Sequence, residues 1–310
     1  MAGRTDFITE ARWEDVWLIW YTLVDDAYQS LEKHYGAWRR TGPNPRFSDS
    51  EVITISLIID TWFAGHEALG LSFLRQYHAS MFPRLPANGW FNQRRTKLCL
   101  LIEQIRQVLN QQYGLVSTDD SVRLIDSAPV FVATYTRGQR NQTLQGKEYF
   151  GIAKSKGAKV FGIRLHITST VDQVVDTWLL APASVHDSTP MAAILEQSHD
   201  LLVLGDGAFH KPVLESVLRE KHAIQILKPP RKNNRNQEPW PEEKQRWIGR
   251  VRRRVETTFS VLQTVFRIEQ PAARSLPGLI ARISTRILAY NLCFVTQFFL
   301  GQLTSIQTPN

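Results

Sequence analysis

Three acidic residues occupy positions from which they could carry out chemistry. Asp126 ends the apolar run 122–125 and Asp206 follows the apolar run 201–204, whereas Glu256 lies within the basic segment 250–259. Carboxylate oxygens are the ligands that hard cations such as Mg²⁺ prefer. Two carboxylates at strand ends and a third on a later helix could hold two such ions, one at the attacking oxygen and one at the leaving oxygen of a phosphoryl transfer.

Each acid taken alone also has an ordinary structural explanation. An Asp after a strand is commonly a turn residue, and Asp206 directly precedes a glycine. Glu256 could be a surface residue paired with Arg252 one helical turn earlier. The combination of three acids, each ending or bordering a core element, is what indicates a metal site. From the residues alone both interpretations stay open.

The distribution of charge indicates a polyanionic partner such as nucleic acid. The net charge is +8, and the window 228–254 holds ten Lys or Arg against three Glu, which gives +7 in that window. A basic patch of this kind binds backbone phosphates without reading sequence. The residues that we expect to contact phosphates there are Lys228, Arg231, Lys232, Arg235, Arg250, Arg252 and Arg253.

Trp240 and His186 are two further candidates for an accessory role at the site. Trp240 lies in the basic window, where an aromatic ring could stack on an unpaired base, although it could equally anchor its loop between two prolines. His186 could contact substrate, or it could pack in a capping loop before the helix start that Ser188-Thr-Pro190 indicates. We expect Asp187 near the N-cap of that helix.

The first part of the chain, residues 1–118, has the pattern of a helical domain. A capping box at Ser48–Glu51 predicts one helix start, and a further helix is expected over 91–112. The turn at its start is basic and includes Arg94 and Arg95, which fits a helix-turn-helix-like DNA-binding domain. An ordinary helical bundle with a solvated basic turn explains the same pattern.

Strand patterns begin at residue 120 and predict an α/β domain with a mixed sheet over 119–270. Strands are expected at 122–125, 159–168, 173–180, 201–205 and 223–227, and helices at 211–220 and 242–268. On the last helix the apolar residues form one stripe. Glu256 lies about 100° from Val255 in that stripe and should therefore border the core. Residues 271–310 are expected to form a C-terminal helix that packs on the catalytic core.

Composition excludes several classes of protein. Two cysteines in 310 residues do not build a disulfide framework, and no Cys/His spacing predicts zinc. Residues 1–12 lack the apolar run of a signal peptide. The most apolar stretch, 287–300, is shorter than the roughly 20 residues of a membrane span. We therefore expect a protein of a reducing, cytosolic compartment with no membrane partner.

These motifs together resemble the DDE-type transposases of bacterial insertion sequences, which belong to the ribonuclease H-like superfamily that includes retroviral integrases. The resemblance covers roughly residues 120–295, and the order and spacing of its motifs carry it. The motifs are Leu124-Ile-Asp-Ser127, the strand Gly162–His166, Pro182–Asp187, Gly205–Phe209, the segment Lys228–Lys232, and Arg252-x-x-x-Glu256-x-x-Phe259.

The resemblance implies a fold, a cofactor and a reaction. It implies a ribonuclease H-like catalytic domain, α/β with a mixed five-stranded sheet and flanking helices, preceded by an all-α N-terminal domain. Asp126, Asp206 and Glu256 would be the catalytic and metal-binding triad, holding two Mg²⁺ per site with Mn²⁺ as a possible substitute. The partners would be double-stranded DNA, as inverted terminal repeats and target, and a second copy of the chain in a homodimer on DNA.

The sequence departs from the family pattern at two positions near Glu256. Related transposases often carry Tyr three residues before the arginine and Lys seven residues after the glutamate, where this chain has Gly249 and Gln263. The 50 residues from Asp206 to Glu256 also leave no room for the β-rich insertion of some relatives, which indicates a compact branch.

Two other functions fit the same residues. A ribonuclease H-like nuclease would cut nucleic acid without joining ends, and a domesticated relative would bind DNA as a regulator without cutting it. Retention of all three acids argues against the regulator.

Overall fold

The chain folds into two compact units, formed by Met1–Leu115 with Leu262–Asn310 and by Val116–Val261. The computed structural model describes residues 13–36, 47–117, 120–153, 157–206, 209, 211–229 and 240–299. The boundary between the units falls within one helix, α8 (Glu242–Thr264). The predicted N-terminal domain, 1–118, therefore lacks a part that comes from the C-terminal end of the chain.

The first unit is helical. Its described helices are α1 (Trp13–Tyr35), α2 (Asp49–Trp62), α3 (Glu67–Tyr77), α4 (Asn88–Lys97), α5 (Cys99–Gln112) and α9 (Leu276–Phe299). The predicted start of α2 is confirmed, because Ser48 and Glu51 each bond the other's backbone N–H in a capping box. The helix expected over 91–112 is two helices, since the chain turns at Leu98, whose N–H donates to the carbonyls of Arg94 and Arg95.

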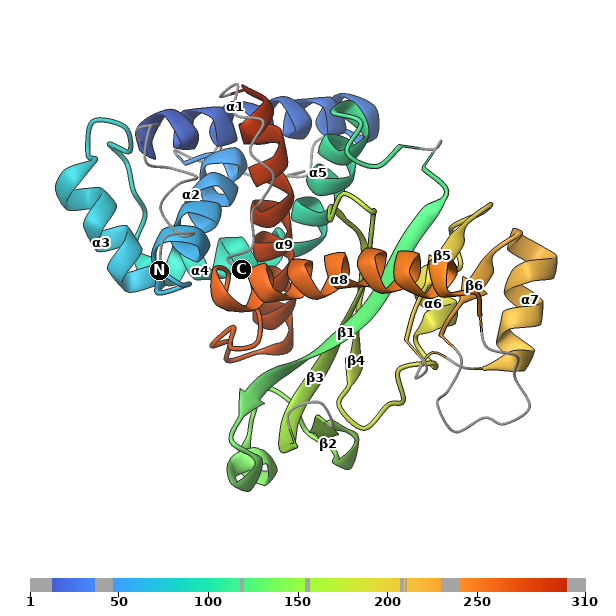
Figure 1. The fold of residues 1–310 in the computed structure, drawn as a ribbon. Coiled ribbons are helices and arrows are strands. Elements are labelled where there is room, and N and C mark those ends of the chain that lie inside the picture. The colour runs from blue at the N-terminus through green and yellow to red at the C-terminus, as the bar shows by residue number, and fades with distance from the viewer. Residues whose placement is uncertain are drawn as a thin grey trace. The chain divides into compact units, whose positions relative to one another are not determined.

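The C-terminal helix α9 packs elsewhere than we expected. It contacts α1, α2, α4 and α5 and belongs to the helical unit instead of the sheet-containing unit (Figure 1). Two buried hydrogen bonds fix it there, from Trp20 Nε1 to Thr296 Oγ1 at 2.8 Å and from Asn291 Nδ2 to Asn110 Oδ1 at 2.9 Å. Its segment 276–297 is long and apolar enough to span a bilayer, yet 72% of that window is buried within the protein, as in a core helix.

The second unit is built on one mixed sheet. Its strands are β1 (Val122–Ala133), β2 (Phe150–Ala153), β3 (Ala158–Ser169), β4 (Val175–Pro182), β5 (Leu202–Leu204) and β6 (Gln225–Leu227). Strand β3 pairs antiparallel with β1, β2 and β4, whereas β5 pairs parallel with both β1 and β6. The order is β2-β3-β1-β5-β6, with β4 also paired to β3. The path from β4 through β3, β1 and β5 to β6 is the five-stranded ribonuclease H-like arrangement that the resemblance implies.

The described sheet has a sixth strand that the sequence did not predict. β2 is only four residues long and contains a glycine, so it lacks the alternating pattern that identifies a strand. It pairs with the first part of β3, and β4 pairs with the remainder. The short strand therefore extends the sheet edge and leaves the order of the other five unchanged.

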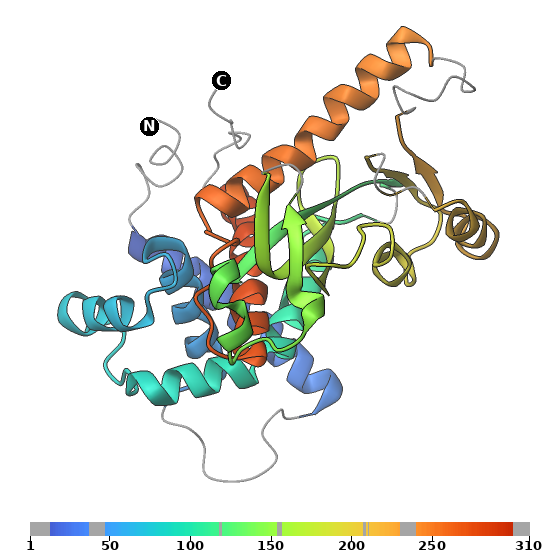
Figure 2. The ribbon, with the colours of Figure 1, turned by 90° about the horizontal axis from the view of Figure 1, so that it is seen from below.

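The core of this unit lies where β1 and β5 meet two further helices, α6 (Met191–Leu195) and α7 (Pro212–His222) (Figure 1). Ile125 of β1 and Val203 of β5 are buried there with residues of both helices. The predicted stripe of α8 is also buried, at Ile248, Val251, Val255, Phe259, Leu262 and Phe266. The first turns of α8 project beyond the strands, and residues 242–247 are exposed (Figure 2).

Candidate active site

Asp126 and Asp206 lie at the same level of two neighbouring parallel strands. The register of β1 with β5 pairs Leu124 with Leu204, and each aspartate follows its paired leucine by two residues. Parallel strands lie about 4.8 Å apart, so the two carboxylates are neighbours at the C-terminal end of β5. The sheet topology thus brings together two acids that are 80 positions apart in the sequence.

The environment of Asp126 disfavours a bare negative charge. Burial first, and then the nearby charges of Asp206 and Asp187, raise the pKa of its carboxyl, whereas the N–H of Ser127 and the guanidinium of Arg252 lower it; the net result is a pKa of about 6. The Ser127 N–H donates to Asp126 Oδ1 at 2.8 Å. A cation between these carboxylates would offset the cost of burying their charge and would cancel the repulsion between them. The pair therefore fits a divalent metal ion.

The helix α8 places Arg252 near this pair. Arg252 is close enough to Asp126 to lower its pKa, and Glu256 follows one helical turn later on the same side of the helix. Glu256 itself is exposed and makes no hydrogen bond or ion pair with described residues. The prediction that Glu256 borders the core is therefore wrong. Glu256 also forms no ion pair with Arg252. Across the described residues, no three His, Cys, Asp or Glu side chains converge closely enough to hold a metal ion.

A second polar cluster, formed by Ser127, Arg164 and Asp187, adjoins Asp126. From the sequence we expected Asp187 near a helix N-cap. Asp187 accepts hydrogen bonds on Oδ1 from Ser127 Oγ at 2.8 Å and from Arg164 Nη1 at 2.5 Å. The helix that follows has Pro190 as its N-cap and no side-chain cap. Asp187 is therefore an ion-pair partner of a central strand instead of a cap residue. The alternation of polar residues at 164 and 166 in an otherwise apolar strand is the signal that could have revealed this cluster.

His166 is the most deeply buried member of this neighbourhood. It is 1% exposed, and neither ring nitrogen has a hydrogen-bond partner among described residues. Burial lowers its pKa to about 4, so the ring is neutral at neutral pH. It faces Ser127 across the β1–β3 pair.

The two accessory candidates have local partners. His186 is exposed, and its Nδ1 lies 2.9 Å from Ser188 Oγ, which agrees with packing in the capping loop. The ring of Trp240 has Lys244 Nζ at 4.5 Å from its centre, and its carbonyl accepts from Gln245 Nε2. Trp240 therefore anchors the start of α8, and its ring is partly exposed.

The predicted phosphate contacts divide into several groups. Arg250 and Arg253 are exposed on α8, and Arg252 is partly exposed. Lys228 forms an ion pair with Glu215. Arg231, Lys232 and Arg235 lie outside the described residues.

Two predicted contacts in the helical unit have structural partners. Arg94 donates through two nitrogens to the carboxylate of Asp49. Arg95 is 1% exposed and forms ion pairs with Asp60 and Glu67. A guanidinium buried between two carboxylates cannot reach a DNA phosphate. The prediction that Arg95 binds DNA is wrong, because a basic turn looks the same in sequence whether its arginines face solvent or acids.

A family of known proteins accounts for this arrangement. The model of the family described as "Transposase DDE domain" matches residues 117–292. This chain belongs to that family. It is a DDE-type transposase, and the match includes all three acids as well as Arg252. No curated protein sequence matches the chain.

Solved transposase structures show distant likeness. The piggyBac transposase synaptic complex with hairpin DNA matches 94% of this chain and 76% of its own, with 10% identity and a TM-score of 0.47. The Mos1 transposase paired-end complex with left transposon end matches 82% and 96%, with 11% identity and a TM-score of 0.23. The Mos1 mariner paired end complex with Mn matches 83% and 98%, with 10% identity and a TM-score of 0.22. The family match, and not these likenesses, identifies the transposase.

Proposed function

We propose that this transposase binds the inverted terminal repeats of its element, cleaves phosphodiester bonds at the ends and joins the freed 3′-hydroxyl to target DNA. The observation that carries the proposal is the level placement of Asp126 and Asp206 on adjacent parallel strands, with Arg252 beside Asp126. Asp126 and Asp206 would be an unfavourable pair in a purely structural role, because burial and the charge of Asp206 both disfavour the ionised form of the Asp126 carboxyl.

Asp126, Asp206 and Glu256 would hold two Mg²⁺, and Mn²⁺ could replace them. When bound, the ions would lower the pKa of the attacking oxygen and neutralise the charge that develops at phosphorus. The two aspartates would orient the reacting phosphate at the end of β5. Glu256 is one turn from Arg252, so a rotation of its side chain would direct it toward the same carboxylates.

The arginines of α8 would hold the DNA. Arg252 lies near the carboxylates, where its guanidinium would balance a phosphate in the site. Arg250 and Arg253 are exposed on the same helix and would contact phosphates on either side. Contacts of this kind supply affinity and register but no sequence preference. Terminal-repeat recognition is proposed for the helical unit, through residues other than Arg95.

The proposed assembly is a homodimer on DNA, because a mobile element has two ends and each needs an active site. The proposed location is the bacterial cytoplasm, on the nucleoid, where the DNA substrate lies.

An end-joining assay tests this function. The DNA that flanks the gene would be searched for short inverted repeats, and duplexes that end in them would be incubated with target DNA and Mg²⁺. We expect joined products from ends with a 3′-hydroxyl and none from ends with a 3′-deoxy sugar. Cleavage without joining would identify a nuclease, and binding without cleavage would identify a regulator; either result contradicts the proposal.

A further inference from the structure

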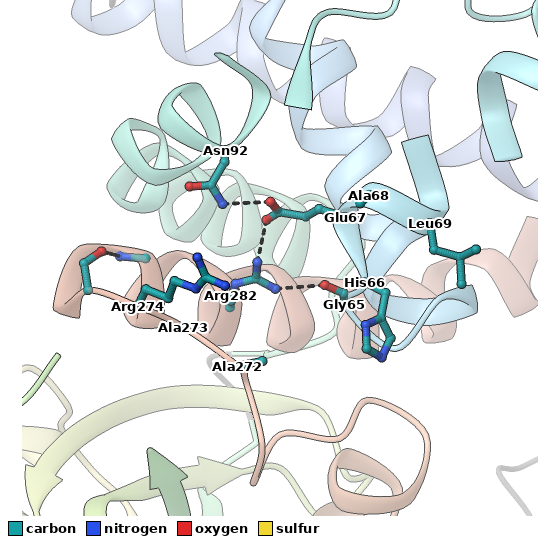
Figure 3. A pocket seen from close by; sticks show the side chains of 12 residues that line it. Gly65, His66, Glu67, Ala68, Leu69, Asn92, Ala272, Ala273, Arg274 and Arg282 are labelled. Carbon is teal, nitrogen blue, oxygen red and sulfur yellow. Dashed lines mark hydrogen bonds and ion pairs between the residues drawn. The ribbon is translucent and has the colours of Figure 1, made fainter. Parts of the chain in front are cut away.

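The helical unit contains a pocket of about 650 Å³, whose lining residues include none of the three acids. It is lined by the turn before α3, by α4 and by the start of α9 (Figure 3). Its polar side chains include Asn92, Arg274 and Arg282. Arg274 is exposed at the rim, whereas Arg282 is only 9% exposed.

The one carboxylate in the pocket wall is already fully engaged. Glu67 accepts hydrogen bonds from Asn92 Nδ2 at 2.7 Å and from Arg282 Nη2 at 2.7 Å (Figure 3). It also accepts one from Arg95 Nη1 at 3.2 Å. Arg282 also donates from Nη1 to the carbonyl of Gly65 at 3.0 Å. The wall therefore offers donors and positive charge in excess of its single acid.

Behind the wall, buried cations outnumber buried anions. The guanidinium groups of Arg95, Arg282 and Arg286 share the carboxylates of Asp60 and Glu67, so the group carries one uncompensated positive charge. Arg286 is 0% exposed, and its Nε and Nη2 have no hydrogen-bond partner among described residues. Burial, with the neighbouring arginines, lowers the pKa of Arg286 to about 10. An uncompensated buried charge is costly unless an anion approaches it.

Gly65 lies between this buried charge and the pocket. A Cβ atom at Gly65 would lie 2.7 Å from Arg286 Nη2, 3.1 Å from Asp60 Oδ1 and 3.4 Å from Arg282 Nη1, so no side chain separates the pocket wall from these two guanidinium groups and the carboxylate that they share. Gly65 also has a φ of +82°, a conformation that favours glycine. The glycine therefore lets the buried charge act on the pocket.

Two helix N-termini add positive potential at the same place. α3 begins at Glu67 and its N-cap, His66, makes no side-chain cap. α9 begins at Leu276, after Ser275, whose Oγ accepts from the N–H of Gly278. The N-terminus of a helix carries roughly half a positive charge. Both helices start at residues that line the pocket or adjoin them.

We propose that this pocket binds a backbone phosphate of DNA. The inference rests on the proposed function, because that function supplies DNA as the source of the phosphate. Guanidinium groups suit the planar, two-point recognition of phosphate oxygens, and Arg274 at the rim would be the first group that the DNA meets. The contact would anchor the helical unit on DNA without reading sequence.

The test uses the full-length protein and a substitution that fills the pocket with negative charge. Ala68 is exposed in the first turn of α3 and lines the pocket. Ala68→Glu is favourable for the helix, because an acid near a helix N-terminus is stabilising, yet it should exclude a phosphate. The matched control is Val213→Glu, which adds the same charge at the same place in α7, where Val213 is 77% exposed. Arg274→Gln and the exposed Arg219→Gln form a second pair.

Two measurements are made on each variant. The first is the melting temperature in inorganic phosphate against chloride at equal ionic strength. The second is the salt dependence of binding to a short duplex of arbitrary sequence. We expect phosphate to raise the melting temperature of the wild type and of both controls but not of Ala68→Glu or Arg274→Gln. The salt slope should fall by about one in these two variants only.

Two outcomes would overturn the inference. Equal melting temperatures in phosphate and chloride, with unchanged slopes, would exclude an anion site. A phosphate effect with unchanged slopes would show that the pocket takes free phosphate and not DNA. Cleavage activity separates this inference from the proposed function: a protein with the expected slopes that never cuts DNA contradicts only the function, and one that cuts DNA with unchanged slopes contradicts only the pocket.

Discussion

At the scale of single residues, the carboxyl of Asp126 determines how the site behaves without metal. Its pKa is raised to about 6, first by burial and then by Asp206. A carboxyl whose pKa is higher in the folded than in the unfolded protein stabilises the fold at low pH. That contribution is lost as the pH rises from about 4 to about 6. At pH 7 the ionised side chain therefore lowers the free energy of unfolding.

Replacing Asp126 by Asn should accordingly stabilise the metal-free protein. We expect Asp126→Asn to raise the free energy of unfolding at pH 7 by about 1–3 kcal/mol, because the asparagine side chain has nearly the same shape as the aspartate but carries no buried charge. Mg²⁺ should raise the melting temperature of the wild type and leave that of the variant unchanged. The control is Asp172→Asn at an exposed turn. A variant less stable than the wild type without metal would contradict this description of the carboxyl.

Residue roles were predicted well where a local sequence pattern determines them. They were predicted poorly where they depend on an ion-pair partner that is distant in the sequence. Asp206 follows the end of β5, as its apolar run predicts. Asp126 lies within β1 and not at its end, because the strand continues to Ala133. The register of β1 with β5 nevertheless places the two acids at the same level. Arg95 and Asp187 were misassigned, because their roles depend on Asp60 and on Arg164, which are distant in sequence. No local pattern contains the identity of such a partner.

At the scale of elements, close backbone packing between β1 and β3 holds the strand that carries Asp126. A Cβ atom at Gly162 would lie 2.0 Å from the carbonyl oxygen of Val130. That oxygen belongs to the backbone of the neighbouring strand, so it cannot move aside without breaking the pairing. The level of Asp126 in the sheet thus depends on the absence of a side chain at Gly162.

Substituting two glycines should have opposite effects on stability. We expect Gly162→Ala to lower the free energy of unfolding by about 3 kcal/mol or more, because β1 must shift. Gly249→Ala in α8 should raise it by about 0.5–1 kcal/mol, since a Cβ there meets nothing within 4 Å and alanine favours a helix. Urea unfolding of both variants gives the comparison. A stable Gly162→Ala protein would mean that the two strands do not pack this closely.

Helix and strand patterns predicted most elements of the sheet-containing unit. The hairpin of β3 with β4 and the buried stripe of α8 follow from apolar periodicity, and both are present. The short strand β2 and the break at Leu98 were missed. Each depends on pairing or turning that a few residues cannot reveal by period alone.

At the scale of the whole molecule, the helical unit is discontinuous in sequence. It combines residues 1–115 with residues 262–310, and α9 supplies buried contacts to four of its helices. The boundary predicted from the sequence was residue 118, and the two units divide between Leu115 and Val116. The sequence did not predict that the last helix packs in the first unit, because an apolar helix pattern shows which face is buried but not which element covers it.

A chain that ends at Gln270 should therefore lose the fold of its N-terminal helices. Removal of α9 would expose the residues that it buries and would remove the hydrogen bonds from Trp20 to Thr296 and from Asn291 to Asn110. We expect lower helical content by circular dichroism and rapid proteolysis within residues 13–112. Protease-resistant N-terminal helices in the shortened chain would contradict this assignment of α9.

The most direct test of the central claim is strand cleavage in Mg²⁺ by single carboxylate variants. Asp126→Asn, Asp206→Asn and Glu256→Gln should each abolish nicking at the ends of the element, because each removes one ligand of the metal pair. DNA affinity should stay close to that of the wild type, since phosphate contacts come from other residues. Glu243→Gln, an exposed acid on the same helix as Glu256, should nick at the wild-type rate. Wild-type nicking by Glu256→Gln would show that the three acids do not form one catalytic site.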